Sequence, residues 1–172
     1  PENISYKVVT YPEMKEVADR VKETSLTVDL PSDQPLAAYK YAVFAYNGDM
    51  KGKGRVSNKV VVGRPMEAPY SQDFSTAQKF DICEVVNVNA DANTWIKEGK
   101  YAKYVYNFYN KADDWLLTPP VKLKGGQDYT FSITAKKGIA KYREKIMLGY
   151  GESTDVATFK SMSDSIYITS ME

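Results

Sequence analysis

"YKYAVFAYN", residues 39–47, is the stretch that decides the fold class. Its side chains fall into two alternating sets, Tyr39, Tyr41, Val43 and Ala45 in one and Lys40, Ala42, Phe44 and Tyr46 in the other. Successive side chains of a β-strand point to opposite faces of the sheet. The alternation therefore predicts a strand, and we expect the Tyr39 set to face inward and the Lys40 set to face outward.

Similar short patterns recur along the chain. "SLTVDL" at 25–30, "SNKVVVG" at 57–63 and "YTFSITAK" at 129–136 are typical of strands bounded by polar or glycine and proline residues. The 14 tyrosines add to this tendency because aromatic residues favour strands. Helices are expected only as short pieces around 14–21 and 75–80. The fold class that follows is all-β, built from sandwiches.

Composition excludes several classes of function. The 172 residues include 43% apolar residues, enough to bury a core in one domain or in two small ones. With 23 basic and 22 acidic side chains the chain has no net field that would attract nucleic acid, so no nucleic-acid partner is expected. No apolar run is long enough to span a membrane.

The chain also lacks the usual catalytic residues. It has no histidine, the commonest general base and metal ligand, and its one cysteine, Cys83, has no partner for an internal disulfide. Apolar residues flank Cys83, so we expect an inert, packed thiol. Asp113 and Asp114 are adjacent and would point to opposite faces of a strand, which places them badly for the paired-acid chemistry of a glycosidase. The prediction is that this chain is not an enzyme.

A domain boundary is indicated by two prolines. Pro65 and Pro69 keep the chain extended and cannot donate hydrogen bonds inside a sheet. The linker is therefore placed at 64–69, between a first domain at 1–63 and a second at 70–172.

Four segments of the first domain carry a family resemblance: "ISYKVVTYP", "TSLTVDL", "PLAAYKYAVFAYN" and "VSNKVVVG". In this order they resemble strands C, E, F and G of a fibronectin type III domain, an immunoglobulin-like sandwich, with Tyr39 at the tyrosine-corner position. The first two strands of that fold have no counterpart here. Their absence would leave an apolar face and an unpaired edge. We therefore expect the chain to extend before Pro1, or another molecule to cover that face.

The second domain carries a different series of segments: "PYSQDFS", "VNVNADANTW", "KYVYNFYN", "DDWLLTPPVKL", "YTFSITAK" and "KIMLGYGESTDVATF". The series resembles the first two thirds of the cleaved-adhesin, or choice-of-anchor J, family. These are jelly-roll modules related to MAM domains, found on surface and secreted proteins of Bacteroidetes, gingipain adhesin regions among them. The resemblance implies a jelly-roll sandwich and a secreted or bacterial cell-surface location. The closing strands of that fold are expected beyond Glu172, or this chain forms a reduced sandwich.

The proline pair of the second domain has a physical interpretation. Pro119 and Pro120 cannot donate ladder hydrogen bonds, so they mark a sheet edge or a crossing between sheets. Trp115, Leu117 and Val121, on either side of the pair, are expected in the core.

A calcium loop is the one cofactor site that the second resemblance implies. Asn87, Asn89 and Asp91 lie at alternate positions where relatives hold calcium, and oxygens spaced in this way can converge on a hard cation. Two of the three are uncharged, so any calcium affinity would be weak. The alternative is an Asx-type turn capped by its own side chains.

A tyrosine-rich segment offers a candidate ligand surface. Strand alternation would place Tyr104, Tyr106 and Phe108 on one face, where an exposed ring could stack on a sugar. The alternative is that these rings pack in the core, since strands buried between layers are aromatic on both faces.

Two functions remain open. The first is a non-enzymatic module of a secreted or cell-surface protein that binds a host or matrix glycan or protein in adhesion. The second is an accessory binding or spacer region of a larger secreted peptidase or glycoside hydrolase.

Overall fold

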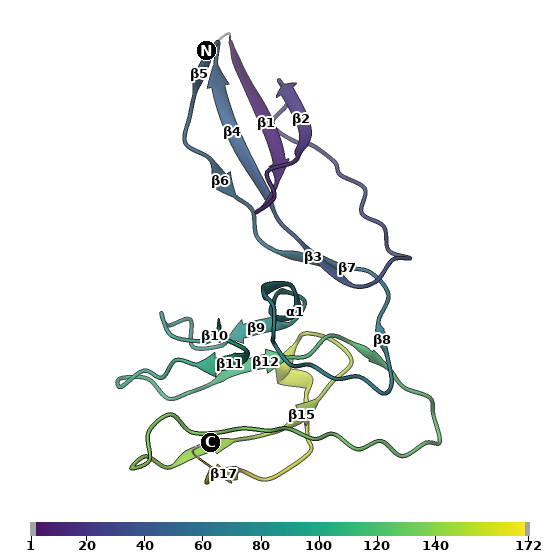
Figure 1. The fold of residues 1–172 in the computed structure, drawn as a ribbon, viewed down its shortest axis with the longest axis vertical. Coiled ribbons are helices and arrows are strands. Elements are labelled where there is room, and N and C mark those ends of the chain that lie inside the picture. Colours follow the sequence, from purple (N-terminus) through teal and green to yellow (C-terminus); the bar gives the residue numbers. More distant parts are fainter. Residues whose placement is uncertain (1–2, 171–172) are drawn as a thin grey trace.

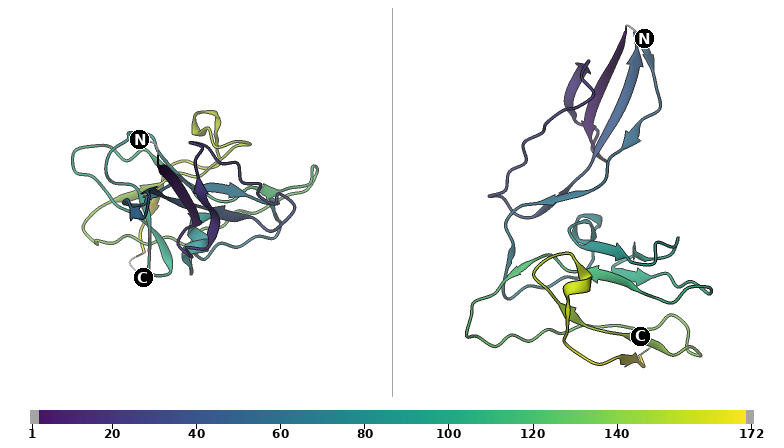
Figure 2. Two further views of the ribbon diagram at one scale, coloured as in Figure 1. Left: turned by 90° about the horizontal axis from the view of Figure 1, so that it is seen from above. Right: turned by 180° about the vertical axis from the view of Figure 1, so that it is seen from behind.

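The computed structural model describes residues 3–170, which fold into two units stacked one above the other (Figures 1 and 2). Strands dominate both units. The helical pieces of the described chain are α1 (Ala77–Asp81) and the 3-10 turn η1 (Val156–Thr158). The predicted all-β, sandwich-like class is confirmed.

The first unit is built on one antiparallel sheet in the order β2-β1-β4-β5, with β6 also paired to β4. Its strands are β1 (Ile4–Thr10), β2 (Glu16–Val21), β4 (Tyr41–Asn47), β5 (Met50–Lys51) and β6 (Arg55–Val56). A second ladder joins β3 (Ala37–Tyr39) to β7 (Val60–Val62). The longest pairing, β1 with β4, runs without a break from Ile4 opposite Asn47 to Thr10 opposite Tyr41.

The core of the first unit lies where β1 meets β4. Val9 and Ala42 are paired across the ladder and are each 3% exposed. The predicted inward face of residues 39–47 is therefore wrong, because Ala42 is buried while Val43 is 36% exposed. Both faces of this strand carry apolar side chains, so the sequence pattern identifies the strand but not the side that the fold covers.

Two local predictions in the first unit fail and one holds. The helix expected around 14–21 is wrong: Glu16–Val21 forms β2, antiparallel to β1. The strand expected at 25–30 is also wrong, since these residues cross from β2 to β3 without a ladder partner among the described residues. The strand expected at 57–63 is confirmed in β7.

The second unit consists of short ladders. Its strands are β8 (Met66–Glu67), β9 (Glu84–Asn87), β10 (Trp95–Glu98), β11 (Tyr101–Tyr104), β12 (Asp114–Leu117), β13 (Val121–Lys122), β14 (Glu144–Ile146), β15 (Gly149–Tyr150), β16 (Lys160–Ser161) and β17 (Ile166–Ile168). The antiparallel pairs are β9 with β12, β10 with β11, β14 with β17 and β15 with β16. Figure 1 shows β9 to β12 in one layer and β15 and β17 in a second layer below it.

The proline pair separates two ladders, as expected. β12 ends at Leu117, Pro119 is buried, and β13 begins at Val121. β13 pairs in parallel with β8, and the Met66 N–H donates to the Pro120 carbonyl at 2.8 Å. Part of the segment expected as a linker is thus a strand of the second unit's ladder.

The helix expected around 75–80 is confirmed as α1. Thr76 is its N-cap, and its Oγ1 accepts the Lys79 N–H at 3.2 Å. This bond satisfies one of the backbone donors that a helix start leaves free.

The prediction of a strand at 129–136 is wrong, because these residues pair with no other strand among residues 3–170. The segment runs along the lower layer (Figure 1), and Tyr129, Phe131 and Ile133 are 43%, 49% and 49% exposed. Alternation of side chains indicates an extended backbone, but it carries no information about whether a partner strand is present.

The molecule exposes more surface than its mass requires. Its accessible area is 13,208 Å² for 19.4 kDa. A compact monomer of this mass would expose about 8,500 Å², and two independent domains of half the mass about 10,200 Å² together. Division into two units therefore explains only part of the excess area.

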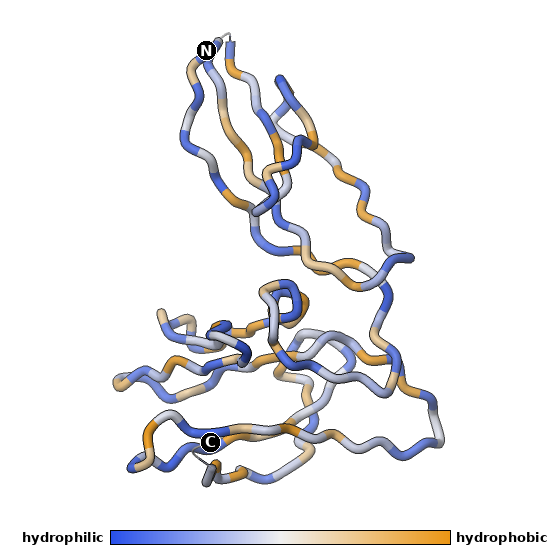
Figure 3. Tube along the Cα trace, in the orientation of Figure 1, coloured by the Kyte–Doolittle hydropathy of each residue, from blue (hydrophilic) through white to orange (hydrophobic). Residues whose placement is uncertain are grey.

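Figure 3 shows hydrophobic and hydrophilic residues alternating along the trace of both units.

Helix α1 lies between the two units. Lys40 Nζ is 3.5 Å from an Asp81 carboxylate oxygen. Lys59 Nζ is 3.4 Å from a Glu84 carboxylate oxygen and also donates to the Cys83 carbonyl. Across residues 3–170, no helix is both long and apolar enough to cross a membrane.

Candidate ligand-binding site

The loop that follows β11, residues 105–111, presents aromatic rings to solvent. Tyr106 is 47% exposed, Phe108 77% and Tyr109 95%. The rings of Tyr106 and Phe108 meet edge to face with their centroids 4.9 Å apart. We call residues 105–111 the aromatic loop. Rings this exposed on a loop are free to contact a ligand.

Tyr104 does not join this surface. Its ring packs against Trp95 with centroids 5.5 Å apart, and it is half-buried. Burial raises the pKa of Tyr104, and the charges of Asp114 and Asp91 add to the rise. The structure therefore divides the predicted trio, since β11 ends at Tyr104 and strand alternation does not extend to Tyr106 and Phe108.

Asp91 fixes the aromatic loop in place. One carboxylate oxygen accepts hydrogen bonds from the side-chain amides of Asn107 at 2.9 Å and Asn110 at 3.1 Å. The other oxygen accepts the Asn93 backbone N–H at 2.7 Å. These bonds, led by the one from Asn93, hold the pKa of Asp91 below its usual range. Asn93 in turn donates its side-chain amide to the Tyr106 carbonyl at 2.8 Å.

The remaining asparagines of the predicted calcium loop continue this scaffold. Asn89 accepts the Asp91 N–H at 3.0 Å and donates to the Lys111 carbonyl at 2.9 Å. Asn87 donates to the Asp91 carbonyl at 2.8 Å. The structure thus places Asn87, Asn89 and Asp91 in a turn capped by its own side chains, and that turn holds the aromatic loop.

A set of buried oxygens lies beside this turn. Both carboxylate oxygens of Asp114, Oδ1 of Asn87 and Oγ1 of Thr94 are buried and have no hydrogen-bond partner within residues 3–170. Asp114 and Asn87 are paired residues of β12 and β9. An ionised carboxylate is costly to bury without a partner.

Whether a residue could bind calcium depends on whether its side-chain oxygens are free, and not only on the alternate positions of Asn87, Asn89 and Asp91 in the sequence. Hydrogen bonds already occupy Asn89 Oδ1 and both carboxylate oxygens of Asp91, whereas Asp114 and Asn87 offer free oxygens of the type that calcium prefers. In the described chain no group of three or more His, Cys, Asp or Glu side chains is arranged to hold a metal. A cation here would therefore depend on amide and hydroxyl oxygens as well.

Sequence reasoning missed Asp114 as a site residue. Asp113 is exposed, whereas Asp114 is half-buried and both of its carboxylate oxygens are buried, as expected for neighbours around a strand start. The available signal was that the second acid of "DDWLL" belongs to the strand and lies one residue before a tryptophan. The core position expected for Trp115, Leu117 and Val121 is wrong, because each of the three is only half-buried.

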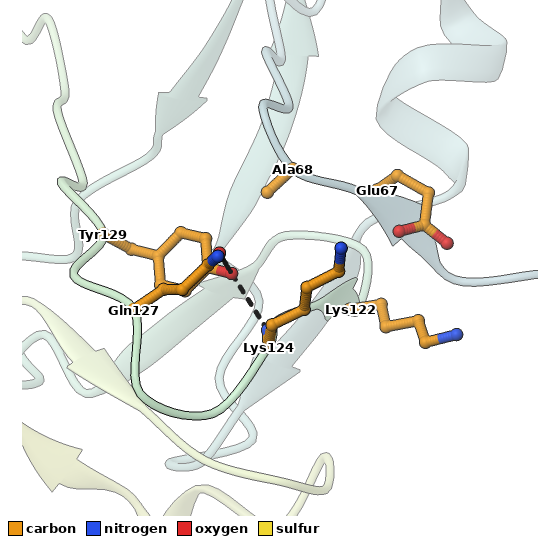
Figure 4. A pocket seen from close by; sticks show the side chains of 6 residues that line it. All are labelled: Glu67, Ala68, Lys122, Lys124, Gln127 and Tyr129. Atoms are coloured by element: carbon orange, nitrogen blue, oxygen red, sulfur yellow. Dashed lines mark hydrogen bonds between the residues drawn. The ribbon is translucent and has the colours of Figure 1, made fainter.

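A shallow pocket of about 220 Å³ lies elsewhere, beside the ladder of β8 and β13 (Figure 4). It is lined by Glu67, Ala68, Lys122, Lys124, Gln127 and Tyr129. The Tyr129 hydroxyl accepts the Lys124 backbone N–H at 2.9 Å and donates to Gln127 Oε1 at 3.0 Å. Figure 4 shows the Lys124 side chain rising toward Ala68 and Glu67, with the Tyr129 ring and Gln127 on its other side.

Cys83 is 1% exposed, in agreement with the expected packed thiol. Burial raises the pKa of its thiol to about 11. The thiol is therefore protonated at neutral pH and lacks the thiolate that a nucleophile requires.

Comparison of the chain with protein-family models, with curated proteins and with solved structures finds no match.

Proposed function

We propose that this chain is a non-enzymatic binding module of a secreted or cell-surface protein and that its aromatic loop binds carbohydrate. The observation that carries the proposal is the exposure of Tyr106, Phe108 and Tyr109 on a loop that Asp91 holds in place. Exposed apolar groups on loops are a common feature of binding sites.

Carbohydrate is the ligand class that suits these side chains. The apolar face of a sugar ring can pack on an aromatic ring, and a tyrosine hydroxyl can bond to sugar hydroxyls. The polar groups next to the rings are mainly neutral asparagines, which favours an uncharged glycan. Because side-chain hydrogen bonds already order the loop, binding loses less conformational entropy than it would on a free loop.

The wider setting is part of the same proposal. The chain consists of a fibronectin type III-like domain followed by a jelly-roll adhesin-like domain of the kind found on Bacteroidetes surface proteins, and β8, in the segment expected as a linker, pairs within the second of them. Further strands, from the same polypeptide or another, complete the two sandwiches, and the large exposed area supports this. The partner is a host or matrix glycan or protein. The alternative is an accessory region of a larger secreted peptidase or glycoside hydrolase, and the sequence of the whole protein would decide between them.

Binding to a glycan array, followed by titration calorimetry with the best neutral glycan, tests the proposal. Replacing Tyr106 and Phe108 together by alanine should weaken binding about tenfold or more, given the worth of aromatic contacts. The matched control replaces Tyr11 and Tyr150, two other exposed tyrosines, and should leave affinity unchanged. An array with no bound glycan, or an equal loss in the control, would contradict the proposal.

We also infer that calcium stabilises the ladder beneath the aromatic loop. The observation that favours it is the buried, unpartnered carboxylate of Asp114 next to Asn87 Oδ1. A calcium ion bound there would be the positively charged partner that the Asp114 carboxylate does not have within the described residues, and its role would be structural.

A further inference from the structure

We propose that residues 127–136 form an open strand edge to which an extended acidic peptide adds as a β-strand. We call residues 127–136 the open edge.

The backbone of the open edge supports this assignment. Within the described chain, no backbone hydrogen bond joins residues 127–136 to another segment, and the first such bond is from the Lys137 N–H to the Ser170 carbonyl at 3.0 Å. The segment nevertheless follows an extended path along the lower layer (Figures 1 and 2). An extended backbone with free N–H and C=O groups can accept a further strand.

The side chains of the open edge offer cross-strand partners. Tyr129, Phe131 and Ile133 occupy alternate positions and are 43–49% exposed. Aromatic and β-branched residues are the side chains that gain most from a facing strand. The molecule as a whole exposes about 3,000 Å² more than two separate compact domains would, several times the roughly 800 Å² that one partner buries in a standard interface.

Charge identifies the kind of peptide. Residues 121–145 contain seven basic and two acidic side chains, although the whole chain has a net charge of only +1. The basic residues are Lys122, Lys124, Lys136, Lys137, Lys141, Arg143 and Lys145. None of them forms an ion pair within residues 3–170. Positive charge at both ends of an unpaired edge is complementary to an acidic strand.

The pocket beside β13 gives the incoming strand an anchor. It lies at the start of the open edge, and its lining includes two lysines, Lys122 and Lys124, against one acid, Glu67. The Lys124 amino group extends toward Ala68 at this pocket and can receive a carboxylate (Figure 4). An acidic polysaccharide would meet the same lysines but could not extend the backbone ladder, so the free backbone groups favour a peptide.

Two synthetic decapeptides test the proposal with the intact chain. A peptide of alternating glutamate and valine is titrated while amide hydrogen exchange is followed, and a second copy of it carries N-methyl groups on alternate amides. The first peptide should bind and slow exchange at residues 128–136 at least tenfold. The methylated peptide should lose this protection, because it cannot form the ladder.

Charge is tested separately. A lysine-valine decapeptide should not bind, and Lys124→Gln with Lys136→Gln should weaken the glutamate peptide about tenfold. The matched control, Lys15→Gln with Lys53→Gln, removes two lysines of the first unit and should have no effect.

Three results would overturn the proposal. The first is unchanged exchange at residues 128–136 with the peptide in excess. The second is displacement of the peptide by a heparin fragment together with equal binding of the methylated peptide, which indicates charge alone. The third is a concentration-dependent dimer that protects the same amides without peptide, which makes a second copy the occupant.

Discussion

Two aspartates of the second unit lie in opposite environments. Asp91 accepts three hydrogen bonds from asparagines, so its charge is compensated. The carboxylate oxygens of Asp114 are buried and accept none within residues 3–170. Asp91 orders the aromatic loop, whereas we expect the unpartnered carboxylate of Asp114 to lower the stability of the ladder of β9 with β12.

The aromatic loop should loosen in acid. Because hydrogen bonds lower the pKa of Asp91 in the folded protein, its contribution to stability is fully present above the unfolded pKa of about 3.9 and is lost as pH falls through the lowered value. Amide exchange at Asn107 to Asn110, measured from pH 6 down to pH 2, should show protection disappear at the acid end. Asp91→Asn should lower protection at pH 6 and remove its acid dependence, and Asp113→Asn should behave like the unaltered chain. Protection that is constant with pH would contradict this.

Asp114→Asn should separate the effects of charge and calcium. In EDTA the substitution replaces a carboxylate whose oxygens have no hydrogen-bond partner and should raise the free energy of unfolding by about 1 kcal/mol. Added calcium should stabilise the unaltered chain and not the variant. Urea unfolding with and without calcium measures both effects. A calcium response that survives in Asp114→Asn would show that the ion binds elsewhere.

At the scale of elements, the sequence predicts extended conformation better than pairing. Most of residues 39–47 forms a strand as expected, although the chain leaves one ladder at Tyr39 and enters the next at Tyr41. Residues 114–117 form a strand, and the Thr76 cap marks α1. Residues 25–30 and 129–136 have the alternation of strands but no ladder, because a partner strand is a property of the rest of the fold. The segment 14–21 pairs with β1 although its local pattern suggests a helix.

The candidate site shows the same limit. The spacing of Asn87, Asn89 and Asp91 identifies a loop rich in oxygen ligands. It does not show that Asp91 accepts hydrogen bonds from Asn107 and Asn110, which are 16 and 19 residues further along the chain. The exposure of Phe108 could not be predicted either, because the sequence does not show that β11 ends at Tyr104.

The ladder of β3 and β7 depends on a glycine at its end. Gly63 has φ +139°, and a Cβ there would lie 2.5 Å from the Leu36 Cα. Gly63→Ala should therefore lower the free energy of unfolding by about 1–3 kcal/mol. Chemical denaturation measures the change. Gly125→Ala, where a Cβ meets nothing within 4 Å, should have little effect, and an equal effect at both positions would contradict this explanation.

At the scale of the whole molecule, α1 and β9 receive two lysines from the first unit. Lys40 reaches Asp81, and Lys59 reaches Glu84 and the Cys83 carbonyl. These contacts restrict the angle between the units, while the chain that joins them is short.

Lys40→Ala with Lys59→Ala should free that angle. Each ion pair is partly exposed, so the loss of overall stability should be small, about 1 kcal/mol or less for each pair. Small-angle X-ray scattering should show a larger and broader distribution of intramolecular distances. The control pair, Lys15→Ala with Lys53→Ala, should leave the scattering curve unchanged. An unchanged curve for Lys40→Ala with Lys59→Ala would show that other contacts fix the angle between the units.

The parallel pairing of β8 with β13 has a mechanical consequence. It involves two residue pairs, against seven in the ladder of β1 with β4. If the polypeptide is stretched along its length, β8 should detach and lengthen the chain before the ladder of β1 with β4 opens. The segment around Met66 would then act as a small force-absorbing element.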